Sequence, residues 1–376
     1  MEALVLTRCQ QMINGDFWSG KRVLVTGHTG FKGAWLCIWL RELGALVSGF
    51  SLKPTTSPAL YDLAKLGETI TSHMGDIRSE AAIRQVIRTA EPEILIHMAA
   101  QPLVRASYAD PVTTYATNVM GTVHVLEAAR EVESVKVVIN VTSDKCYENR
   151  EWVWAYRESD AMGGYDPYSS SKGCAELVTS AYRRSFLTDT GIALASARSG
   201  NVIGGGDWSA GRIVPDLLRA VETGESIDIR NPEAVRPWQH VLEPLAGYLI
   251  LAQKLLEDES RYADAWNFGP SENSAIPVRE LARRLFNLLE SEAGWKDSSQ
   301  ASPYESQLLR LDVSKAKQGL GWEPLWSIDD TLEKVAEWHR GWRSKVDIES
   351  LCIGQIDAYQ NQVANRSQRQ NAMGGG

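Results

Sequence analysis

The chain has 376 residues, a length that suits one large domain or two unequal ones. Its hydrophobic content of 44% and charged content of 23% are ordinary for a globular protein, and its formal net charge of −8 speaks against general binding to nucleic acid. No apolar run approaches the ~20 residues of a membrane-spanning helix, so we expect no membrane segment. The five cysteines are scattered without a C-x-x-C pair, which predicts reduced thiols in a cytoplasmic protein and no zinc site.

The two ends of the chain differ in composition from the rest. The N-terminus lacks the basic region, apolar core and cleavage site of a signal peptide, and Met12 is a candidate functional start. The last residues are polar and end in three glycines. We therefore predict disordered extensions over residues 1–13 and 360–376.

Short runs rich in β-branched residues alternate with helical patterns through the first half of the chain. The runs predict strands over residues 21–26, 45–50, 69–74, 94–98, 135–142 and 192–198. The helical patterns between them cover residues 34–44, 79–90, 111–132 and 167–188. Ser79 is suited to cap the second of these helices. Such alternation predicts an α/β fold with a Rossmann-type, doubly wound parallel sheet.

The pattern becomes irregular after Ser199. Four further helices are predicted, over residues 213–222, 244–257, 278–290 and 329–340. We predict a smaller, mixed C-terminal domain made of residues 200–236 and 271–345, packed against a sheet domain of residues 14–199. The segment of about 237–270 is expected to return to the sheet domain.

A glycine-rich turn follows the first predicted strand, with Gly27, Gly30 and Gly33 at regular spacing before a helix begins. The G-x-x-G-x-x-G spacing is a dinucleotide fingerprint, because glycines let the backbone approach a pyrophosphate and the helix N-terminus supplies free N–H donors. The turn also contains the predicted cofactor contacts Thr29, Phe31 and Lys32.

Further cofactor contacts are predicted at the ends of later strands, because these ends meet at one edge of a parallel sheet. Asp76 and Ile77 follow the third strand and fit an adenine contact. Ala99, Ala100 and Gln101 follow the fourth strand and would line the floor of the site.

The residues after the second strand leave the phosphate state of the cofactor open. NAD-binding sheets usually carry an acidic residue there for the ribose 2′-hydroxyl, whereas this chain has Ser51 and Lys53. Ser51 can hydrogen-bond a ribose, and Lys32 and Lys53 could instead meet a 2′-phosphate. We predict NAD and keep NADP as the alternative.

Four ionisable side chains are predicted to gather near the end of the fifth strand. Asp144 and Lys145 directly follow that strand. Tyr168 and Lys172 are four residues apart in a helical pattern and so share one helix face. A nearby cation favours phenolate, so we expect the pKa of Tyr168 to be lowered towards working pH. The pattern therefore indicates proton transfer beside a dinucleotide.

These motifs resemble the extended short-chain dehydrogenases/reductases over about residues 14–345. The residues that carry the resemblance are Gly27-x-x-Gly30-x-x-Gly33, Tyr168-x-x-x-Lys172 and Arg198-Ser-Gly-Asn201. Within that family, the blocks G-H-T-G-F-K-G, T-S-D-K-C-Y-E-N and R-P-W-Q-H-V are most similar to the nucleotide-sugar 4,6-dehydratases, in the branch that acts on CDP-glucose.

The resemblance implies an NAD-binding Rossmann domain and a C-terminal nucleotide-sugar-binding domain. It implies conversion of CDP-glucose to CDP-4-keto-6-deoxyglucose and water. Such enzymes are commonly homodimers joined through two helices of each subunit, which here would be the helices over residues 111–132 and 167–188. It also implies that the cofactor contacts include Asn118, Thr142, Tyr168 and Lys172.

The implied chemistry divides the ionisable side chains by task. Oxidation of the sugar at C4 makes the C5 proton removable. Tyr168 would be the base for the 4-hydroxyl, Lys172 would lower the pKa of Tyr168 and hold the nicotinamide ribose, and Ser143 would bond the 4-oxygen. Asp144, with a raised pKa, would protonate the departing 6-hydroxyl. Lys145 stands where dTDP-glucose dehydratases carry glutamate as the C5 base, a role that would require a depressed lysine pKa.

The diphosphate of the substrate needs cations and hydrogen-bond donors. Arg236 is the first candidate, with Arg212 and Arg230 behind it. Asn201, Gln101 and Ser143 complete the predicted substrate contacts, and Trp208 and Trp238 stand in the same motif loops. The six histidines show no metal-ligand spacing, so no metal is predicted.

Three other functions stay open. One is a 4,6-dehydratase of another nucleotide sugar, and a second is a nucleotide-sugar 4-epimerase on the same scaffold. An epimerase would need Tyr168 and Lys172 but no acid/base pair for loss of water, so Asp144 and Lys145 argue against it. The third is a silent dinucleotide-binding regulator, which would typically lack Tyr168 or Lys172.

Overall fold

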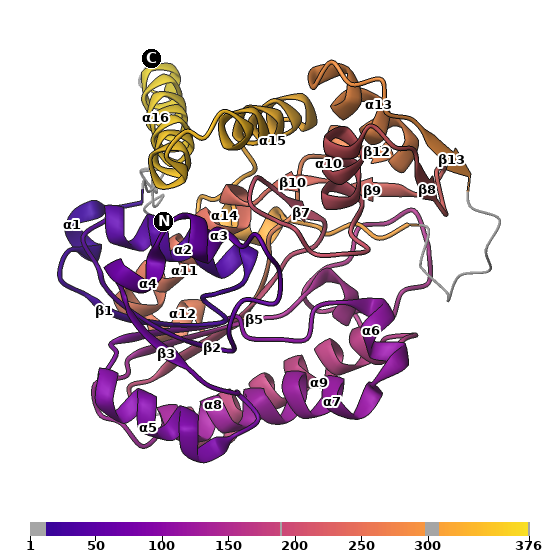
Figure 1. Ribbon diagram of the computed structural model, residues 1–376. Coiled ribbons are helices and arrows are strands. Elements are labelled where there is room, and N and C mark those ends of the chain that lie inside the picture. Colours follow the sequence, from indigo (N-terminus) through magenta and orange to yellow (C-terminus); the bar gives the residue numbers. More distant parts are fainter. Residues whose placement is uncertain (1–12, 189, 298–307, 375–376) are drawn as a thin grey trace.

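Seven parallel strands form the central sheet, in the order β11-β6-β5-β4-β1-β2-β3 (Figure 1). The computed structural model describes residues 13–188, 190–297 and 308–374. The sheet strands are β1 (Arg22–Thr26), β2 (Leu46–Ser51), β3 (Thr71–Met74), β4 (Ile94–His97), β5 (Val137–Val141), β6 (Ala193–Arg198) and β11 (Ala265–Asn267). The strand order reverses between β1 and β4, and in such sheets the ligand crevice lies at this reversal, beyond the carboxyl ends of the strands.

Helices cover both faces of the sheet, as the predicted doubly wound fold requires (Figure 1). Side chains alternate between the faces, so Val23 and Val25 join one apolar core while Leu24 joins the other. The first core includes α2 (Phe31–Glu42) and α11 (Leu242–Glu257). The second core lies below the sheet and is formed by α5 (Glu80–Ala90), α8 (Gly121–Ala129) and part of α9 (Pro167–Tyr182).

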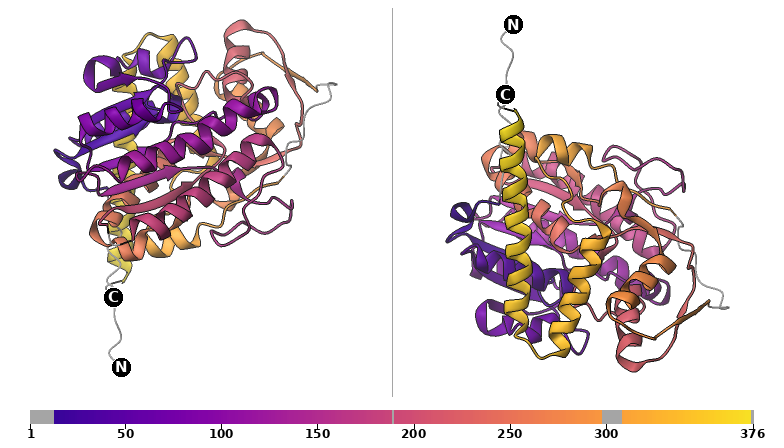
Figure 2. Two further views of the ribbon diagram at one scale, coloured as in Figure 1. Left: turned by 90° about the horizontal axis from the view of Figure 1, so that it is seen from below. Right: turned by 90° about the horizontal axis from the view of Figure 1, so that it is seen from above.

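Two predicted helices each contain a turn of π-helix. The first consists of α7 (Pro111–Tyr115), η1 (Ala116–Met120) and α8. The second consists of α9 followed by η3 (Arg183–Leu187). Viewed from below, these two long helices run side by side over the sheet (Figure 2). A π turn widens the helix locally and often marks a functional site, and Asn118 lies in η1.

The remaining elements of the sheet half are short. The cap predicted for α5 is confirmed, because the Ser79 side chain accepts a hydrogen bond from the Ala82 amide. The short elements are α1 (Gly15–Trp18), α3 (Leu60–Leu63), α4 (Leu66–Thr69), α6 (Val104–Ala109), η2 (Asp144–Cys146), α12 (Glu259–Tyr262) and α14 (Ser314–Gly319).

The smaller part of the chain has its own apolar core. Its helices are α10 (Ile213–Thr223), α13 (Val278–Leu288) and α15 (Ile328–Arg343), close to the predicted bounds. Its short strands pair as β7 (Val202–Ile203) with β10 (Gln239–His240), β8 (Ile227–Ile229) with β13 (Trp295–Asp297), and β9 (Val235–Pro237) with β12 (Ala275–Pro277), and η4 (Glu272–Ser274) precedes β12. The segment expected to return to the sheet contributes α11 and β11.

The prediction of a disordered C-terminus is wrong for residues 360–374, because helix α16 (Ile348–Gly374) continues through them. Figure 2 shows this helix crossing the molecule beside α15. Its inward residues Cys352, Ile356 and Tyr359 are fully or almost fully buried, and the Tyr359 ring packs edge-on against Trp39. The helix is therefore docked through residues that precede the polar tail. Residues 1–12 lie outside the described residues.

Within the described ranges, no helix has both the length and the apolar character needed to cross a membrane.

Candidate active site

The glycine-rich turn is packed too closely to admit side chains. A Cβ on Gly27, whose φ is +78°, would lie 2.8 Å from the Ala99 nitrogen, and one on Gly33 would lie 2.2 Å from the Gly27 oxygen. Gly30 precedes α2 without a side-chain cap. The first N–H groups of α2 are therefore left for an anion, so these residues fit the pyrophosphate of a dinucleotide.

The end of β2 carries hydroxyl groups where an acidic residue would select NAD. The Thr29 hydroxyl donates to the Leu52 carbonyl at 2.8 Å and lies 2.9 Å from the Ser51 hydroxyl. Lys53 is exposed just beyond. Hydroxyl groups can bond a neutral ribose, and Lys53 is the cation that stands at this strand end.

The segments after β3 and β4 are each held in place by contacts of their own. Asp76 forms a two-point ion pair with Arg78, whose hydrogen bonds lower the pKa of the carboxyl. Ile77 is buried against Gly121. The Asn118 side chain accepts from the Gln101 amide at 2.8 Å and donates to the Gln101 carbonyl at 3.1 Å. Asn118 therefore fixes the loop that follows β4 through two hydrogen bonds to the Gln101 backbone.

Lys32 does not lie near the end of β2. Its ammonium donates to the Ser199 hydroxyl at 2.8 Å and to the Tyr248 hydroxyl at 2.6 Å. Desolvation, followed by the charges of Lys172 and Arg212, lowers the pKa of Lys32 to about 7. Lys32 therefore lies near Asp144 and Lys172, at what the sequence predicts to be the catalytic end of the site. A contact between Lys32 and a 2′-phosphate beside Ser51 is not supported.

Asp144 is buried at the end of β5, in the short helix η2. Its carboxylate accepts from the Ser143 hydroxyl at 2.9 Å and from the Asn201 amide at 3.4 Å. It also fills the space beside Gly200, where a Cβ would lie 1.9 Å from a carboxylate oxygen. Asn201 has a left-handed φ of 51°, which turns the chain sharply at this point. Ser143, Asp144 and Asn201 are thus brought together as predicted contacts.

Lys145 is half-buried next to this carboxylate, and its backbone amide donates to the Ser143 hydroxyl at 3.2 Å. Among the described residues, no acceptor lies within hydrogen-bond distance of its ammonium. The side chain is therefore available to a substrate.

Tyr168 lies in the first turn of α9, on the helix face that also carries Lys172. The helix is capped by Asp166, which accepts from the Ser169 amide, and has Pro167 at its first position. Burial raises the pKa of Tyr168 to about 12, while the hydrogen bond with Ser143 opposes that rise. The predicted downward shift is therefore not present here, because desolvation of a phenolate outweighs nearby cations.

Lys172 lies one turn further along α9 and is also buried. Its ammonium donates to the Val141 carbonyl at 3.3 Å. Burial lowers the pKa of Lys172 to about 8, and the carboxylate of Glu176 opposes this change. Tyr168 and Lys172 thus share a buried helix face that meets the ends of β5 and β6.

The three predicted arginines come from three different elements of the smaller part. Arg212 precedes α10, pairs with Asp207 at 3.0 Å, and acts electrostatically on both Lys32 and Tyr168. Arg230 follows β8, and Arg236 lies on β9 in the smaller part. These electrostatic effects place Arg212 near Lys32 and Tyr168.

Three residues at this end were not recognised from the sequence as parts of the site. Tyr248 comes from α11 and reaches Lys32 across a large gap in sequence. Ser199 links the two, because its hydroxyl contacts both. Glu176 lies behind Lys172 in an ion pair with Arg198. In the sequence, Tyr248 looks like one more apolar position of a buried helix, so nothing marked it as a site residue. Glu176 could have been predicted, because it lies one helical turn after Lys172.

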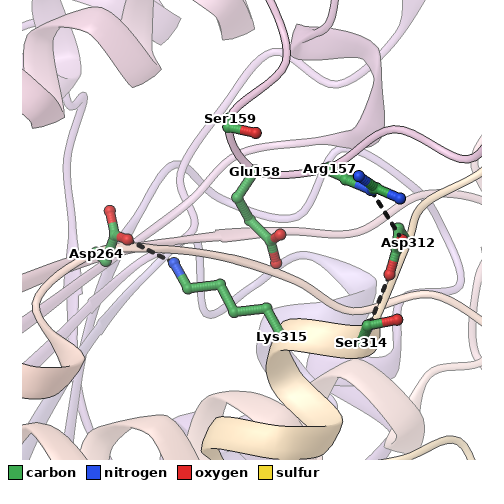
Figure 3. A pocket seen from close by; sticks show the side chains of 7 residues that line it. All are labelled: Arg157, Glu158, Ser159, Asp264, Asp312, Ser314 and Lys315. Atoms are coloured by element: carbon green, nitrogen blue, oxygen red, sulfur yellow. Dashed lines mark hydrogen bonds and ion pairs between the residues drawn. The ribbon is translucent and has the colours of Figure 1, made fainter.

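A cavity of about 540 Å³ lies elsewhere, beside the edge strand β11. Figure 3 shows the Glu158 side chain extending between Lys315 and Arg157. The cations in this cavity already have partners, since Lys315 pairs with Asp264 and Arg157 pairs with Asp312. None of its lining residues is a predicted site residue.

Comparison with known proteins adds evidence from outside the chain. A family model described as GDP-mannose 4,6 dehydratase matches residues 24–335. The CDP-glucose 4,6-dehydratase of Salmonella typhimurium strain LT2 is 52% identical over 336 residues, which are 88% of this chain and 94% of that protein.

Two solved structures share the fold. The dTDP-glucose 4,6-dehydratase of Streptomyces venezuelae, solved with NAD bound, matches with a TM-score of 0.73 and 24% identity over 87% of this chain and 99% of that one. The UDP-glucose 4-epimerase of Thermotoga maritima, solved with UDP-glucose, matches with a TM-score of 0.73 and 23% identity over 85% and 99%.

Proposed function

Because this chain belongs to the GDP-mannose 4,6-dehydratase family, within the extended short-chain dehydrogenases/reductases, we propose that it is an NAD-dependent CDP-glucose 4,6-dehydratase. The observation that carries this proposal is the 52% identity to a CDP-glucose 4,6-dehydratase along most of both chains. The enzyme is a hydro-lyase, which converts CDP-glucose to CDP-4-keto-6-deoxyglucose and water.

The turn from Gly27 to Gly33 would hold the pyrophosphate of NAD, with Ser51 and Asp76 towards its adenosine and Lys172 towards the nicotinamide ribose. When bound there, NAD would supply the hydride-transfer chemistry between C4 and C6 of the sugar. The hydroxyl groups of Thr29 and Ser51 would bind the adenosine ribose in place of the usual acidic side chain after β2.

Tyr168 accepts the proton of the 4-hydroxyl as C4 is oxidised. Because burial raises the pKa of Tyr168, its hydroxyl is protonated at neutral pH. Neighbouring groups must stabilise the phenolate before Tyr168 can act as a base. The Ser143 hydroxyl and the Lys172 ammonium supply that stabilisation. Ser143 can also donate to the 4-oxygen, since it stands between Tyr168 and Asp144.

Asp144 and Lys145 carry out the loss of water. Once C4 is a ketone, the C5 proton is acidic enough for a base to remove, and we assign that base to Lys145. Asp144 donates a proton to the 6-hydroxyl, which leaves as water. The position of Asp144 supports this role, because its carboxyl group is buried at the end of β5 beside Ser143 and Asn201.

The smaller part of the chain binds the nucleotide diphosphate. Arg212 supports this assignment, because it lies between α10 and the catalytic end and its guanidinium can form two parallel hydrogen bonds with a phosphate. Arg230 and Arg236 extend the positive charge along the strands of the same part.

The direct test incubates purified protein with NAD and CDP-glucose. We expect a product that has lost water and shows the alkali-dependent absorbance of a 4-keto sugar, with CDP-glucose used in preference to dTDP-glucose. Inversion at C4 without loss of water would identify an epimerase instead. Bound NAD without turnover of any nucleotide sugar would identify a regulator.

The enzyme is a homodimer in this proposal. Large apolar side chains are exposed on the two long helices below the sheet, where Val112 is 77% exposed, Leu177 61% and Phe186 48%. An exposed apolar face of this kind typically marks a protein–protein contact. A two-fold contact would pair these helices with the same helices of a second copy.

We expect the variant Val112→Glu/Leu177→Glu to be monomeric by size-exclusion chromatography with light scattering, because charges desolvated at an apolar contact disfavour association. Val153→Glu is the matched control, since Val153 is 69% exposed and lies on the loop before α9, outside both helices. A wild-type chain that is already monomeric would contradict the dimer.

A cytoplasmic location completes the proposal. The four described cysteines, Cys37, Cys146, Cys174 and Cys352, are free thiols, and three of them are buried. Free thiols are usual for proteins in a reducing compartment.

A further inference from the structure

We propose that Glu176 is a positioning residue for dehydration, which ties the catalytic helix α9 to the ends of β5 and β6 and supplies the negative charge beside Lys172. This inference rests on the proposed function, because it concerns the charge state of Lys172 during that reaction.

Three donors hold the Glu176 carboxylate in place. The Thr142 hydroxyl donates to Oε1 at 2.5 Å, and the Ser196 hydroxyl donates to Oε2 at 2.7 Å. Arg198 donates to Oε2 at 2.7 Å, in an ion pair whose two side chains are each only 4% exposed. The carboxylate therefore joins one helix to two neighbouring strands, with none of its oxygens left to water.

These partners lie directly before the catalytic segments. Thr142 precedes Ser143 in the chain, and Arg198 precedes Ser199. The Ser199 carbonyl accepts from the Asp144 amide at 3.4 Å. A displacement of Glu176 would therefore move Tyr168 and Lys172 on α9 relative to Ser143 and Asp144 on the strand side.

Glu176 also balances a buried charge. It lies one helical turn from Lys172, and both side chains are nearly inaccessible to solvent. Arg198 keeps the carboxylate ionised, so that despite burial the pKa of Glu176 lies below its usual range. The other titratable groups that act on or around Lys172 are Lys32 on α2, His97 on β4, Asp144 and Cys146 in η2, and Tyr168 on α9.

The replacement Glu176→Gln tests the charge while keeping the shape. The pKa of Lys172, already lowered to about 8, should fall further when the neighbouring carboxylate is lost. Because the reaction needs the ammonium form, the alkaline limb of the kcat profile should move to lower pH by about one unit. Binding of NAD, measured by calorimetry, should weaken over the same pH interval.

A second variant separates this effect from a loss of folding. Glu176→Gln alone leaves the Arg198 guanidinium buried without a counter-charge, which should lower Tm. Glu176→Gln/Arg198→Met removes both charges, so we expect Tm to recover towards wild type while the pH profile stays shifted. Glu280→Gln on α13 is the control, because it breaks an exposed ion pair with Arg283 and Arg284.

The outcomes distinguish the two proposals. If wild-type protein does not dehydrate CDP-glucose, the proposed function fails, and the pH dependence of NAD binding still tests Glu176. If wild type is active but the double variant has a wild-type pH profile, Glu176 has only a structural role and the inference is wrong.

Discussion

Asp144→Asn should lower kcat for CDP-glucose dehydration by about 10²- to 10⁴-fold, the usual contribution of a positioned acid. Asparagine keeps the size of the side chain and its contacts with Ser143 and Asn201, but it has no proton for the 6-hydroxyl. Oxidation at C4 does not need that proton. In single-turnover experiments, the absorbance of reduced nicotinamide should therefore accumulate while little water is lost.

Lys145→Ala completes this test, because it removes the amine assigned to the C5 proton. Wild-type enzyme working in deuterated water should place deuterium at C5, and the Lys145 variant should not. Asp329→Asn on α15 is the control, since Asp329 is 70% exposed and far along the chain from the site. Near-full dehydration by both the Asp144 and Lys145 variants would show that these roles are wrong.

Tyr168→Phe should also lower kcat by about 10²- to 10⁴-fold, but at an earlier step. In this variant the tyrosine hydroxyl beside Ser143 is gone. The 4-hydroxyl of the sugar then has no group to accept its proton, so C4 is not oxidised. Reduced nicotinamide should therefore not appear even in a single turnover. Affinity for CDP-glucose should change little, since one hydroxyl among many contacts is removed.

Tyr182→Phe is the matched control for Tyr168, because it removes a hydroxyl from the same helix. The Tyr182 hydroxyl donates to Glu127 at 2.8 Å, away from the catalytic end. Its loss should leave kcat unchanged. Accumulation of reduced nicotinamide in the Tyr168 variant would overturn the assignment of Tyr168 to C4 oxidation.

Local pattern was enough to predict the sheet. The strand from 21 to 26 was expected because Val23, Leu24 and Val25 form an apolar run rich in β-branched residues, which is typical of a strand buried on both faces in a parallel sheet. The turn after it was readable for a similar reason. A Cβ on Gly33 would lie 2.2 Å from the Gly27 oxygen, so only glycine fits at this position. The glycine in the sequence therefore predicts the close approach of the two backbone segments.

Helix α16 could not be predicted in the same way. Its residues from 360 onwards are polar, and polarity alone is equally typical of a disordered tail. The helix forms because Cys352, Ile356 and Tyr359 meet a surface built from distant residues, including Trp39 and Trp326. That surface exists only after the sheet half has folded.

The sequence by itself determined which groups we propose for the chemistry: the glycine turn, the Tyr168–Lys172 pair on one helix face, and Asp144 with Lys145 at a strand end. Each depends on spacing along one element, which the backbone geometry dictates. The tertiary structure decided the surroundings of these groups. In the folded chain, Lys32 donates hydrogen bonds to Ser199 and Tyr248, and burial raises the pKa of Tyr168. The ion pair between Glu176 and Arg198 lies one helical turn beyond Lys172. Desolvation and charge pairing depend on what else is near, and the neighbours come from elements far apart in the chain.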